Sequence, residues 1–505
     1  MKKYDWITVS SPESQGISSN DISRFLDAVE EEGLQLHSMH IIRNGNMIAA
    51  GVAAPFSEDS IHRIYSAAKG IVSAAVLFAI SEGYFSFDTL VVPLLRKHMP
   101  ENLDERFERL TVYHLLTMTT GHNAETFSKM RFSDDWVRTF FELAPVYEPG
   151  TTFFYDIGAQ YVLNFLILQE TGFNVDEYLK PRLLEPLGIE LLAAKGAQDI
   201  FNSSTIHLRP ADLAKLALFY LNEGCWEGKQ LLDRNLAKDA GRFHVSNYDA
   251  KRGLTNATVG YALHMWRNTI GGFRLDGGQG QFGLVYPDLN MAVGMMSCER
   301  NMHRILELFQ EHVCLTSRKR PLQEDRDGQR MLSKRLENWS LVPPSFRFFS
   351  SFEKTLSGSQ WRFEKNRLGI ETVSFSFEKN SVVTVMFEDA TTQTAVCGRE
   401  GAWNCGKGYL FTREKELEIG DFGLIMFRDR SESFCSAGWL EDETFEIRFR
   451  SPSMLNYVFS RFTFCEEETI LTLSPEFAAE KGSSPVPGLF PKAPEPLVLH
   501  GRRIK

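Results

Sequence analysis

A serine and a lysine lie three residues apart in the stretch "HRIYSAAKGIVSAAVLFAISEG", at the start of a long apolar run. A helix over this stretch would place the Lys69 amine within proton-transfer reach of the Ser66 hydroxyl. Burial beside the positive end of a helix dipole would lower the pKa of the lysine toward neutrality, as a general base requires. The backbone N–H of Ser66 could also donate to an oxyanion. The pair predicts nucleophilic acyl transfer, and an N-capping serine followed by a solvent-reaching lysine is the structural alternative.

The Ser-x-x-Lys spacing is not specific by itself, because "SFEK" occurs twice more, at Ser351–Lys354 and Ser376–Lys379. One copy lies near a charge-rich segment and the other at the end of a strand-like run, so both are most simply surface residues. The run after Ser66 is apolar on nearly every side, which predicts a helix buried in a domain centre and ending near Gly83. The sequence contains no G-x-S-x-G motif, which argues against an α/β-hydrolase.

Composition narrows the remaining classes of function. The 505 residues are 43% hydrophobic and carry a formal net charge of -10, which argues against nucleic acid or an anionic membrane as a partner. The N-terminus lacks an apolar signal-like segment and the apolar runs are too short to cross a bilayer, so we expect a cytoplasmic protein. Seven scattered cysteines, 12 histidines without a metal-binding motif and the lack of a phosphate-binding loop predict no disulfide framework, metal or nucleotide cofactor.

Helical and strand-like segments alternate up to about residue 316 and predict an α+β domain over residues 1–316. We expect an antiparallel sheet flanked by helices, with an all-helical region inserted at about 100–200. Within it, "SSNDISRFLDAVEEEG" predicts a capped helix, and "LHSMHIIRNGNMIAAG" predicts a hairpin that turns at Asn44 and Gly45.

The rest of the chain differs in character. Residues 317–345 are rich in charge and end in two prolines, which predicts a linker. Apolar residues alternate strictly in "TVSFSFEKNSVVTVMF" and "ETFEIRFRSP", so residues 346–473 are expected to form a small antiparallel β domain. The proline-rich residues 474–505 are expected to form a loosely ordered tail.

Several motifs, in this order, resemble the serine β-lactamase and penicillin-binding-protein superfamily. The branch they resemble contains class C β-lactamases, related esterases, D-amino-acid peptidases and 6-aminohexanoate-dimer hydrolases. The resemblance lies in "RIYSAAKG", "LTVYHLLTMTTGH", "EPGTTFFYDIGAQYVLNFLILQETG" and "RLDGGQGQFGLVYPDLNMAV" and extends over roughly residues 10 to 315. It implies the β-lactamase/transpeptidase-like fold, with Ser66 as the nucleophile.

The resemblance also implies roles for later residues. Tyr155 corresponds to the catalytic tyrosine, which moves the proton among serine, lysine and leaving group. The literal Y-x-N at Tyr220–Asn222 ends an amphipathic helix and is interpreted as a packed tyrosine. At the third position of the tyrosine motif Ile157 replaces the asparagine of β-lactamases, which puts β-lactam turnover in doubt.

The closing strand departs from the β-lactamase pattern as well. Residues Leu275, Asp276 and Gly277 stand where those enzymes carry Lys-Thr-Gly, so the usual carboxylate-binding cation is missing. The resemblance implies that Gly277 allows close approach of the substrate and that the N–H of Gly278 is the second oxyanion donor. Two further residues of this glycine-rich bend, Gly280 and Gln281, are expected to contribute to substrate binding. Glycines that serve only a tight strand connection are the alternative.

The sequence thus predicts a serine hydrolase that cleaves a small ester, amide or peptide-like substrate through an acyl-enzyme on Ser66. No organic or metal cofactor, nucleic acid or membrane is expected to take part. A β-lactamase or D-amino-acid peptidase, and a catalytically silent binding protein on the same fold, are the alternatives. The C-terminal β domain offers no catalytic set and is expected to serve packing or oligomerisation.

Overall fold

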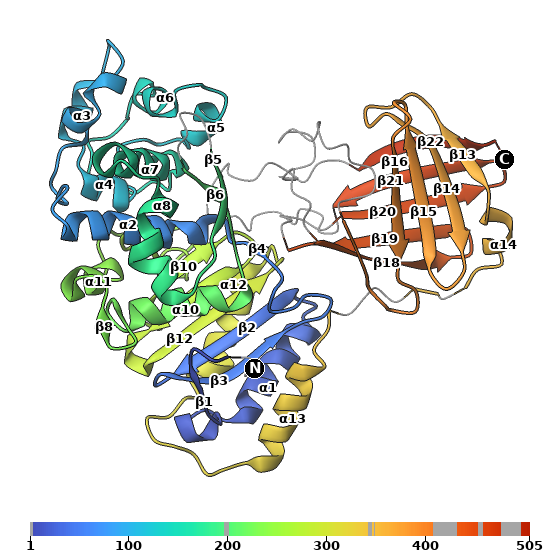
Figure 1. Ribbon diagram of the computed structural model, residues 1–505, viewed down its shortest axis with the longest axis horizontal. Helices are drawn as coiled ribbons and strands as arrows, with labels where there is room; N and C mark the ends of the chain where they lie inside the picture. The colour runs from blue at the N-terminus through green and yellow to red at the C-terminus, as the bar shows by residue number, and fades with distance from the viewer. Residues whose placement is uncertain are drawn as a thin grey trace. The chain divides into compact units, whose positions relative to one another are not determined.

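The computed structural model describes residues 4–195, 201–341, 346–347, 349–407, 432–452, 458–475 and 496–504. These residues form two compact units (Figure 1). Unit 1 holds the described residues of Met1–Val52 and His62–Asn338. Unit 2 holds those of Ala53–Ile61, Trp339–Ser484 and Phe490–Lys505. Within the described residues, no helix has both the length and the hydropathy needed to cross a bilayer.

A seven-stranded mixed sheet forms the centre of unit 1. The strand order is β1-β3-β2-β12-β11-β10-β9, in which β1 runs parallel to β3 and the other neighbours are antiparallel. The strands are β1 (Thr8–Val9), β2 (Leu36–Arg43), β3 (Asn46–Val52), β9 (Trp266–Arg267), β10 (Phe273–Gly277), β11 (Gln281–Tyr286) and β12 (Met291–Ser297).

The first helix and hairpin of the chain form where the sequence predicts them. Helix α1 (Ser19–Glu31) begins after Ser18, whose side chain accepts a hydrogen bond from the backbone N–H of Asn20. Strands β2 and β3 are joined at Asn44 and Gly45, whose φ angles are 49° and 74°. Asparagine followed by glycine suits this turn because both positions require a left-handed backbone.

Helices cover both faces of the sheet. Helix α10 (Pro210–Leu221) packs on β2, β11 and β12, and a Cβ atom at Gly294 would lie 2.5 Å from the backbone N of Ala214 in this helix. Leu275 of β10 faces α2 (Ala68–Ser81), whereas Asp276 faces the opposite side, where α12 (Met302–Phe309) lies. The alternation along β10 therefore separates an apolar face toward α2 from a charged face toward α12.

The helical region predicted at about residues 100–200 packs around α2, whose side chains are buried on nearly every side. Helix α7 (Ile157–Thr171) contacts both α2 and α4. The other elements here are α3 (Val91–Leu94), η3 (Arg96–His98), η4 (Glu105–Arg109), α4 (Val112–Leu116), α5 (Phe127–Met130), α6 (Trp136–Glu142), α8 (Val175–Leu179), η5 (Lys180–Leu184) and α9 (Glu185–Leu187). A three-stranded sheet of order β4-β6-β5 and a small hairpin complete the unit. Their elements, with the nearby helix, are β4 (His62–Arg63), β5 (Leu192–Lys195), β6 (Phe201–Leu208), β7 (Cys225–Trp226), β8 (Lys229–Gln230) and α11 (Arg234–Ala240).

The charge-rich segment 317–345 contains helix α13 (Arg326–Glu337), which packs on α1 and β3 within unit 1. The Arg335 guanidinium bonds to the carboxylates of Asp27 and Glu30 on α1. The charged residues that suggest a linker therefore include several that form ion pairs or lie on the exposed side of α13. Residues 342–345 lie outside the described residues.

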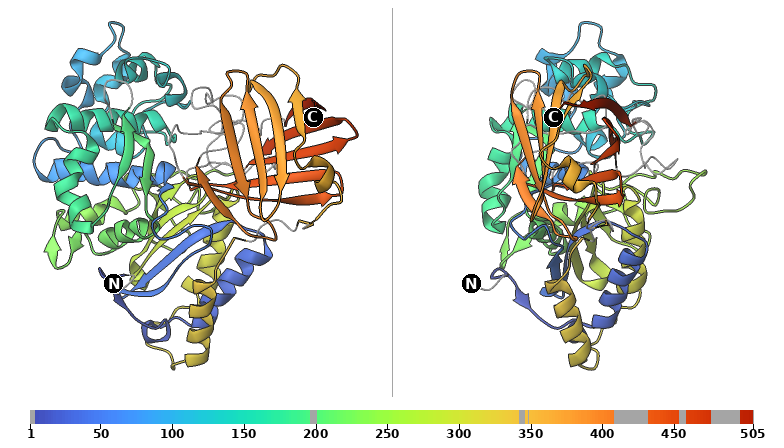
Figure 2. Two further views of the ribbon diagram at one scale, coloured as in Figure 1. Left: turned by 45° about the vertical axis from the view of Figure 1, so that its right-hand side comes forward. Right: turned by 90° about the vertical axis from the view of Figure 1, so that its right-hand side faces the viewer.

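Unit 2 is built on a ten-stranded antiparallel sheet that curls into a barrel-like form (Figure 2). Its strand order is β16-β15-β14-β13-β22-β21-β20-β19-β18-β17. The elements are α14 (Glu353–Leu356), β13 (Gln360–Phe363), β14 (Ile370–Phe377), β15 (Ser381–Phe387), β16 (Thr392–Cys397), β17 (Asn404–Lys407), β18 (Glu432–Glu441), β19 (Thr444–Arg450), β20 (Val458–Cys465), β21 (Glu468–Pro475) and β22 (Leu497–Arg503). The alternating apolar residues of β14 and β19 point into its core, as the period of two requires. Together with unit 1, this confirms the predicted α+β domain followed by an antiparallel β unit.

The proline-rich end of the chain includes strand β22, which pairs with β13 and β21. In this strand Leu499 is buried in the core of unit 2, and Gly501 is closely approached by Phe363 and Thr469. The composition of residues 474–505 thus hides a strand that completes the sheet. Of the predicted tail, residues 476–495 and residue 505 lie outside the described residues.

Candidate active site

Ser66 lies on a short 3-10 turn, η2 (Tyr65–Ala67), that leads directly into α2. The residue before it, Tyr65, has a φ of 48°, in the left-handed region that non-glycine residues rarely adopt. The Arg63 guanidinium lies 4.8 Å from the centroid of the Tyr65 ring, and such packing helps to hold a strained backbone. Ser66 is partly exposed although both neighbours are buried. The turn therefore presents the serine hydroxyl at the entrance of a buried helix.

Lys69 points back toward this hydroxyl, with Nζ 3.4 Å from Ser66 Oγ. The lysine side chain is buried, and the residue is only 2% exposed. Burial lowers the pKa of Lys69 from 10.5 to about 7, against the opposing charges of Glu125 and Asp156. A large fraction of this lysine is therefore neutral at physiological pH, and the neutral amine can accept the proton of Ser66.

Tyr155, the third residue that the sequence predicts for the site, lies beside Ser66 and Lys69. Lys69 Nζ lies 4.8 Å from the centroid of the Tyr155 ring, and the phenol shares a hydrogen bond with the Ser66 side chain. Burial raises the pKa of Tyr155 above its ordinary value, the bond to Ser66 lowers it, and Asp276 and Glu125 raise it further. The phenol is therefore protonated at neutral pH and can donate a hydrogen bond, whereas the neutral amine of Lys69 can accept a proton.

Two aromatic rings hold Tyr155 in place. The ring of Trp266 stacks on it at 5.4 Å between centroids with an interplanar angle of 30°, and the ring of Tyr261 meets it edge-on at 6.4 Å. Both partners come from the segment just before and within β9, far along the chain from Tyr155. This packing fixes the phenol with only two side-chain torsions to restrain.

Asp156 follows Tyr155 directly and caps α7. Its carboxylate accepts hydrogen bonds from the backbone N–H of Gly158 at 3.0 Å and from the backbone N–H and hydroxyl of Thr126 at 3.0 and 2.9 Å. A Cβ at Gly158 would lie 1.9 Å from Thr126 Oγ1, so this close contact requires glycine. Burial raises the pKa of Asp156 to about 6, against these hydrogen bonds. Asp156 therefore ties the segment of Tyr155 to the segment that carries Thr126.

Ile157, which stands at the position of the β-lactamase asparagine, is the first residue of α7 and packs against the apolar core of unit 1. Its side chain offers no amide that could hold a substrate side chain. The third position of the tyrosine motif is therefore apolar in this protein, and the carboxylate at its second position, Asp156, caps helix α7.

Glu125 is an acidic neighbour of the site that the sequence-based reasoning missed. Its two carboxylate oxygens accept hydrogen bonds from the backbone N–H groups of Phe127 at 2.9 Å and Ser128 at 2.8 Å. Burial raises the pKa of Glu125, and the charge of Asp156 raises it further. Nothing in the local sequence distinguishes this glutamate from a surface residue, because only the fold brings its charge near Lys69.

His264 is a second missed residue near the lysine. It has a φ of 60° and is 2% exposed, with Nε2 lying 3.1 Å from the carbonyl oxygen of Leu115. Burial lowers the pKa of His264 to about 3, and the charge of Lys69 contributes to this shift. The imidazole is therefore neutral and adds no positive charge beside the base.

Gly277 at the end of β10 lies against the turn that carries Ser66. A Cβ at this position would lie 2.2 Å from the carbonyl oxygen of Ile64 and 3.1 Å from the backbone N of Ala67. This approach to the Ser66 turn requires glycine at position 277. The predicted close approach of the substrate to Gly277 stays a prediction. Gly278, the next residue, is partly exposed, whereas its neighbours are buried.

The other two residues expected in the bend support its shape. Gly280 has a φ of 87°, and a Cβ there would lie 2.1 Å from Ser297 Oγ. The Gln281 amide donates hydrogen bonds to the carbonyl oxygens of Ser297 and Gly278. These contacts brace the backbone beside Gly278.

Leu275 and Asp276, which lie where β-lactamases carry a cation, both contact other side chains of unit 1. Leu275 is fully buried, and a Cβ at Gly70 of α2 would lie 2.5 Å from its Cγ. On the other face, Asp276 accepts a hydrogen bond from Arg274 Nε at 2.7 Å, and His303 Nε2 lies 3.8 Å from the same carboxylate. Burial raises the pKa of Asp276, but Arg274 and His303 outweigh it, so the pKa is lowered and the carboxylate stays charged.

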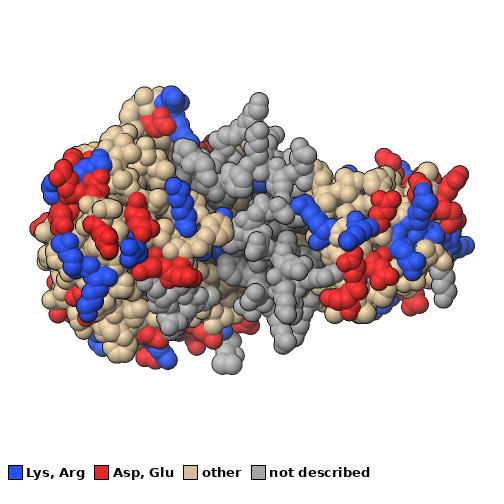
Figure 3. Space-filling model, turned by 90° about the horizontal axis from the view of Figure 1, so that it is seen from above, with Lys and Arg blue, Asp and Glu red and all other residues tan. Residues whose placement is uncertain are grey.

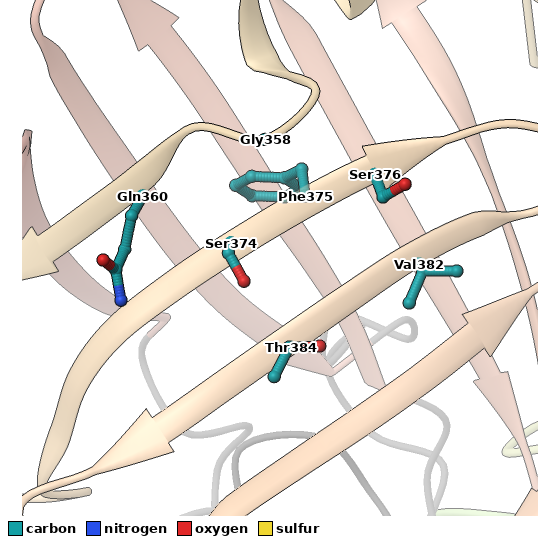
Figure 4. A pocket seen from close by; sticks show the side chains of 7 residues that line it. All are labelled: Gly358, Gln360, Ser374, Phe375, Ser376, Val382 and Thr384. Atoms are coloured by element: carbon teal, nitrogen blue, oxygen red, sulfur yellow. The ribbon is translucent and has the colours of Figure 1, made fainter. Parts of the chain in front are cut away.

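A hollow on the face of the unit 2 sheet is a second candidate for a catalytic site (Figure 4). It encloses about 280 Å³ and is lined by Gly358, Gln360, Ser374, Phe375, Ser376, Val382 and Thr384. Its lining contains hydroxyl and amide groups and no titratable side chain. One of the additional Ser-x-x-Lys serines, Ser376, lies here on a strand and not at the start of a buried helix. The hollow therefore lacks the means to activate a nucleophile.

Exposed charges of both signs are interspersed on the face of the molecule seen in Figure 3. Among the described residues of that face, the charges form no broad positive field of the kind that attracts polyanions. Among the described residues, no group of three or more histidine, cysteine, aspartate or glutamate side chains is arranged to hold a metal ion.

Comparison with known proteins places this site in a family. Residues 26–304, more than half of the chain, match the model of the family named Beta-lactamase. The esterase EstB of Burkholderia gladioli is 24% identical over 208 residues, a match that covers 35% of this chain and 53%, about half, of the esterase.

Among solved structures, a penicillin-binding-protein homologue from Caulobacter crescentus has a TM-score of 0.49 and 15% identity, covering 60% of this chain and 98% of that one. The penicillin-binding-protein homologue from Pyrococcus abyssi has a TM-score of 0.43 and 14% identity, covering 95% of this chain and 99% of that one. The range matched by the family model contains Ser66, Lys69, Tyr155 and Gly277. The chain belongs to the Beta-lactamase family.

Proposed function

We propose that this protein is a serine hydrolase that cleaves esters or amides of small molecules through an acyl-enzyme on Ser66. The observation that carries the proposal is the contact between Lys69 Nζ and Ser66 Oγ, 3.4 Å apart, made by a buried lysine whose pKa lies near 7. A buried amine of this kind can take a proton from the hydroxyl at neutral pH.

In the first step, the Ser66 Oγ–H bond breaks, its proton passes to Lys69 Nζ, and Oγ forms a bond to the substrate carbonyl carbon. The resulting oxyanion accepts hydrogen bonds from the backbone N–H groups of Ser66 and Gly278, each of which contributes about 3 kcal/mol in comparable sites. The bond from carbon to the leaving oxygen or nitrogen then breaks. The leaving group takes the proton from Lys69 through the Tyr155 hydroxyl, which leaves the acyl group on Ser66.

In the second step, water replaces the leaving group. Lys69, again neutral, accepts a proton from the attacking water through Tyr155, and the carbon–Oγ bond breaks. The proton returns to Ser66 Oγ, and a carboxylic acid leaves the site. Apart from this water, no group outside the chain and the substrate is needed to balance either step.

The test is hydrolysis of a p-nitrophenyl butyrate probe by the full-length chain and by Ser66→Ala. We expect the variant to lose at least a thousandfold in kcat/KM, because removal of an activated nucleophile usually has an effect of this order. Ser376→Ala is the matched control, since Ser376 belongs to another Ser-x-x-Lys and lies on a strand of unit 2. Equal turnover by Ser66→Ala and wild type would overturn the proposal.

A fluorophosphonate probe followed by intact mass separates the alternatives. A single adduct that is lost in Ser66→Ala supports an activated serine, whereas no adduct would favour a silent binding protein. A β-lactam probe addresses the other alternative, because a β-lactamase or penicillin-binding peptidase forms a penicilloyl adduct. We expect ester turnover without that adduct, since Leu275 and Ile157 leave the carboxylate and amide of a β-lactam without their usual partners.

A further inference from the structure

We propose that Cys397 and Cys435 are a site of disulfide formation that fastens the sheet of unit 2 where it closes on itself. The oxidant is a small disulfide such as oxidised glutathione. Both residues are thiols in the structure. The inference concerns unit 2 and does not depend on the chemistry of Ser66.

The first support is the backbone at the point where the sheet closes. Strand β16 ends at Cys397, and the next residue, Gly398, forms a parallel bridge with Ser436 of β18. The Gly398 N–H donates to the carbonyl oxygen of Cys435 at 3.0 Å, and the Ala437 N–H donates to the carbonyl oxygen of Gly398 at 2.9 Å. Because β16 is the first strand in the sheet order and β18 the last but one, this bridge closes the sheet. The two cysteines directly precede the two bridged residues.

The second support is the register that this bridge imposes. Neighbouring strands lie about 4.8 Å apart, and residues at the same register position point to the same face of the sheet. Disulfides join residues whose Cα atoms are about 4.4 to 6.8 Å apart. Both side chains belong to the core of unit 2, where Cys397 is 0% and Cys435 5% exposed. The backbone thus places both thiols on one face, at a spacing that a disulfide can span.

The third support is the position of the thiols themselves. Cys435 Sγ lies 3.2 Å from the carbonyl oxygen of Val396, the residue that precedes Cys397. The two cysteine side chains also share a hydrogen bond. This bond and burial raise the pKa of the Cys397 thiol well above its ordinary value. The two sulfurs therefore lie next to each other, and Cys397 remains protonated until its partner has reacted.

The fold also separates Cys435 from a competing thiol. Cys405 lies on β17, the other neighbour of β18, where its register partner is Phe434. The register partner of Cys435 is Asn404, so Cys405 and Cys435 point to opposite faces of the sheet. Cys405 is exposed, whereas Cys435 is buried. The folded chain therefore favours Cys397 as the partner of Cys435.

The chemical step is thiol–disulfide exchange. Cys435, the less buried of the two, loses its proton, and its sulfur attacks one sulfur of the small disulfide. The S–S bond of that molecule breaks, and the released thiolate takes up the proton. Cys397 then loses its proton, its sulfur attacks the Cys435 sulfur of the mixed disulfide, and the second small thiol leaves with that proton. Two electrons pass from the cysteine pair to the small disulfide, which becomes two thiols. An excess of the small thiol reverses the exchange.

The experiment incubates full-length protein with oxidised and reduced glutathione at fixed ratios. In one arm the protein stays folded throughout. In the second arm urea first unfolds the protein and is then diluted into the same buffer, so that burial does not block access to the thiols. A third sample stays in urea and measures the preference of the unfolded chain. Remaining thiols are blocked with N-ethylmaleimide, and linked peptides are identified by mass spectrometry.

The unfolded chain should favour a bond between Cys397 and Cys405, because these residues are 8 positions apart. Cys397 and Cys435 are 38 positions apart, and closing a longer loop costs more entropy. We expect the folded protein to reverse this ratio in favour of Cys435. The bond should also raise the urea midpoint of unit 2 by about 1 M or more.

Two variants assign these effects to the pair. Cys397→Ser should lose both the link to Cys435 and the rise in the urea midpoint on oxidation. Cys465→Ser is the matched control, because Cys465 is an exposed cysteine at the end of β20, and this variant should keep both effects.

The proposal is overturned if wild type yields no link between Cys397 and Cys435 in either arm, or if Cys435 links to Cys405 in the folded protein. A link that leaves the urea midpoint unchanged would show that it does not fasten the sheet. A link in the second arm alone supports the pairing and shows that burial protects the reduced thiols. These outcomes are read from wild type and hold even where a variant fails to fold. They do not involve ester hydrolysis, so they are distinct from failure of the proposed function.

Discussion

Replacement of Lys69 by methionine should stabilise unit 1 at neutral pH while abolishing hydrolysis. The pKa of this lysine falls from 10.5 in an unfolded chain to about 7 in the folded protein, so the folded state disfavours the ammonium form. Because the folded pKa is depressed for a base, the unfolded chain binds more protons between these two values and stability rises with pH across this window. The penalty is greatest below about pH 7 and disappears above about pH 10.5.

The size of the effect follows from the same two values. Linkage gives a penalty of about 4 kcal/mol at pH 7 and about 1 kcal/mol at pH 9.5 for a shift from 10.5 to about 7. The lost contact with Ser66 offsets about 1 kcal/mol of the gain. Methionine has a similar length, flexible torsions and no charge, so it can occupy the buried space.

The assay is urea unfolding of wild type and Lys69→Met, followed by a probe of unit 1, at pH 7 and at pH 9.5. We expect the variant to be more stable by about 2 to 3 kcal/mol at pH 7 and to show almost no gain at pH 9.5. Lys129→Met serves as the control, since Lys129 is exposed on α5 and its replacement should leave stability nearly unchanged. A variant that is less stable at pH 7, or a gain that does not depend on pH, would refute the reasoning.

Three further outcomes test the rest of the site. For wild type, kcat/KM on a neutral ester should rise with pH and reach half its maximum near pH 7, because Lys69 must be neutral to act as a base. Asp156→Asn should move this midpoint to lower pH, because the amide removes a negative charge that favours the ammonium form of Lys69. An unmoved midpoint in the pH–rate profile of the variant would count against this coupling. Tyr155→Phe keeps the stacking on Trp266 but removes the hydroxyl, so kcat should fall about a hundredfold or more with little change in the melting temperature. Steady-state rates near those of wild type would exclude proton transfer through the Tyr155 hydroxyl. Gly277→Ala places a Cβ 2.2 Å from the carbonyl oxygen of Ile64 and should lower both kcat and stability. Gly228→Ala is the control, because Gly228 is exposed and has no atom within 4 Å of the added Cβ, so only backbone strain should result. Equal kcat values and equal melting temperatures for the two variants would contradict the close approach at Gly277.

The parts of the site that the sequence predicts are those encoded locally. Ser66 and Lys69 are three residues apart and open an apolar run, so the helix period alone brings them together. Gly277 belongs to a glycine-rich bend that the resemblance singles out, and the 2.2 Å approach to the Ile64 carbonyl gives a physical reason for glycine there that the sequence does not predict. The same holds for the β2–β3 hairpin, where asparagine and glycine determine the turn within two residues.

Residues brought in by tertiary structure escaped prediction. Glu125 is separated from Lys69 by 56 positions and Asp276 from Tyr155 by 121, and no spacing rule connects either charge to the group on which it acts. Asp156 had a usable signal, because an aspartate directly before an apolar helical run predicts an N-cap, but its influence on Lys69 depends on packing. Strand β22 was missed for a related reason: the proline-rich composition around it outweighs a seven-residue strand that is stabilised by its two neighbours in the sheet.

The acidic residues around Lys69 have a consequence that joins its basicity to the choice of substrate. Burial lowers the pKa of the lysine, while Glu125 and Asp156 oppose this shift, so the value near 7 is a balance between the two effects. A cationic acyl group placed beside Glu125 would partly cancel one opposing charge and would itself disfavour the ammonium form of Lys69. The base would then be more fully neutral in the complex than in the free protein. For an ester whose acyl group is cationic, the midpoint of the pH profile should accordingly lie lower for kcat than for kcat/KM. For an uncharged ester of the same shape, the two midpoints should coincide. Coincident midpoints for both esters would show that the charge of the substrate does not reach Lys69.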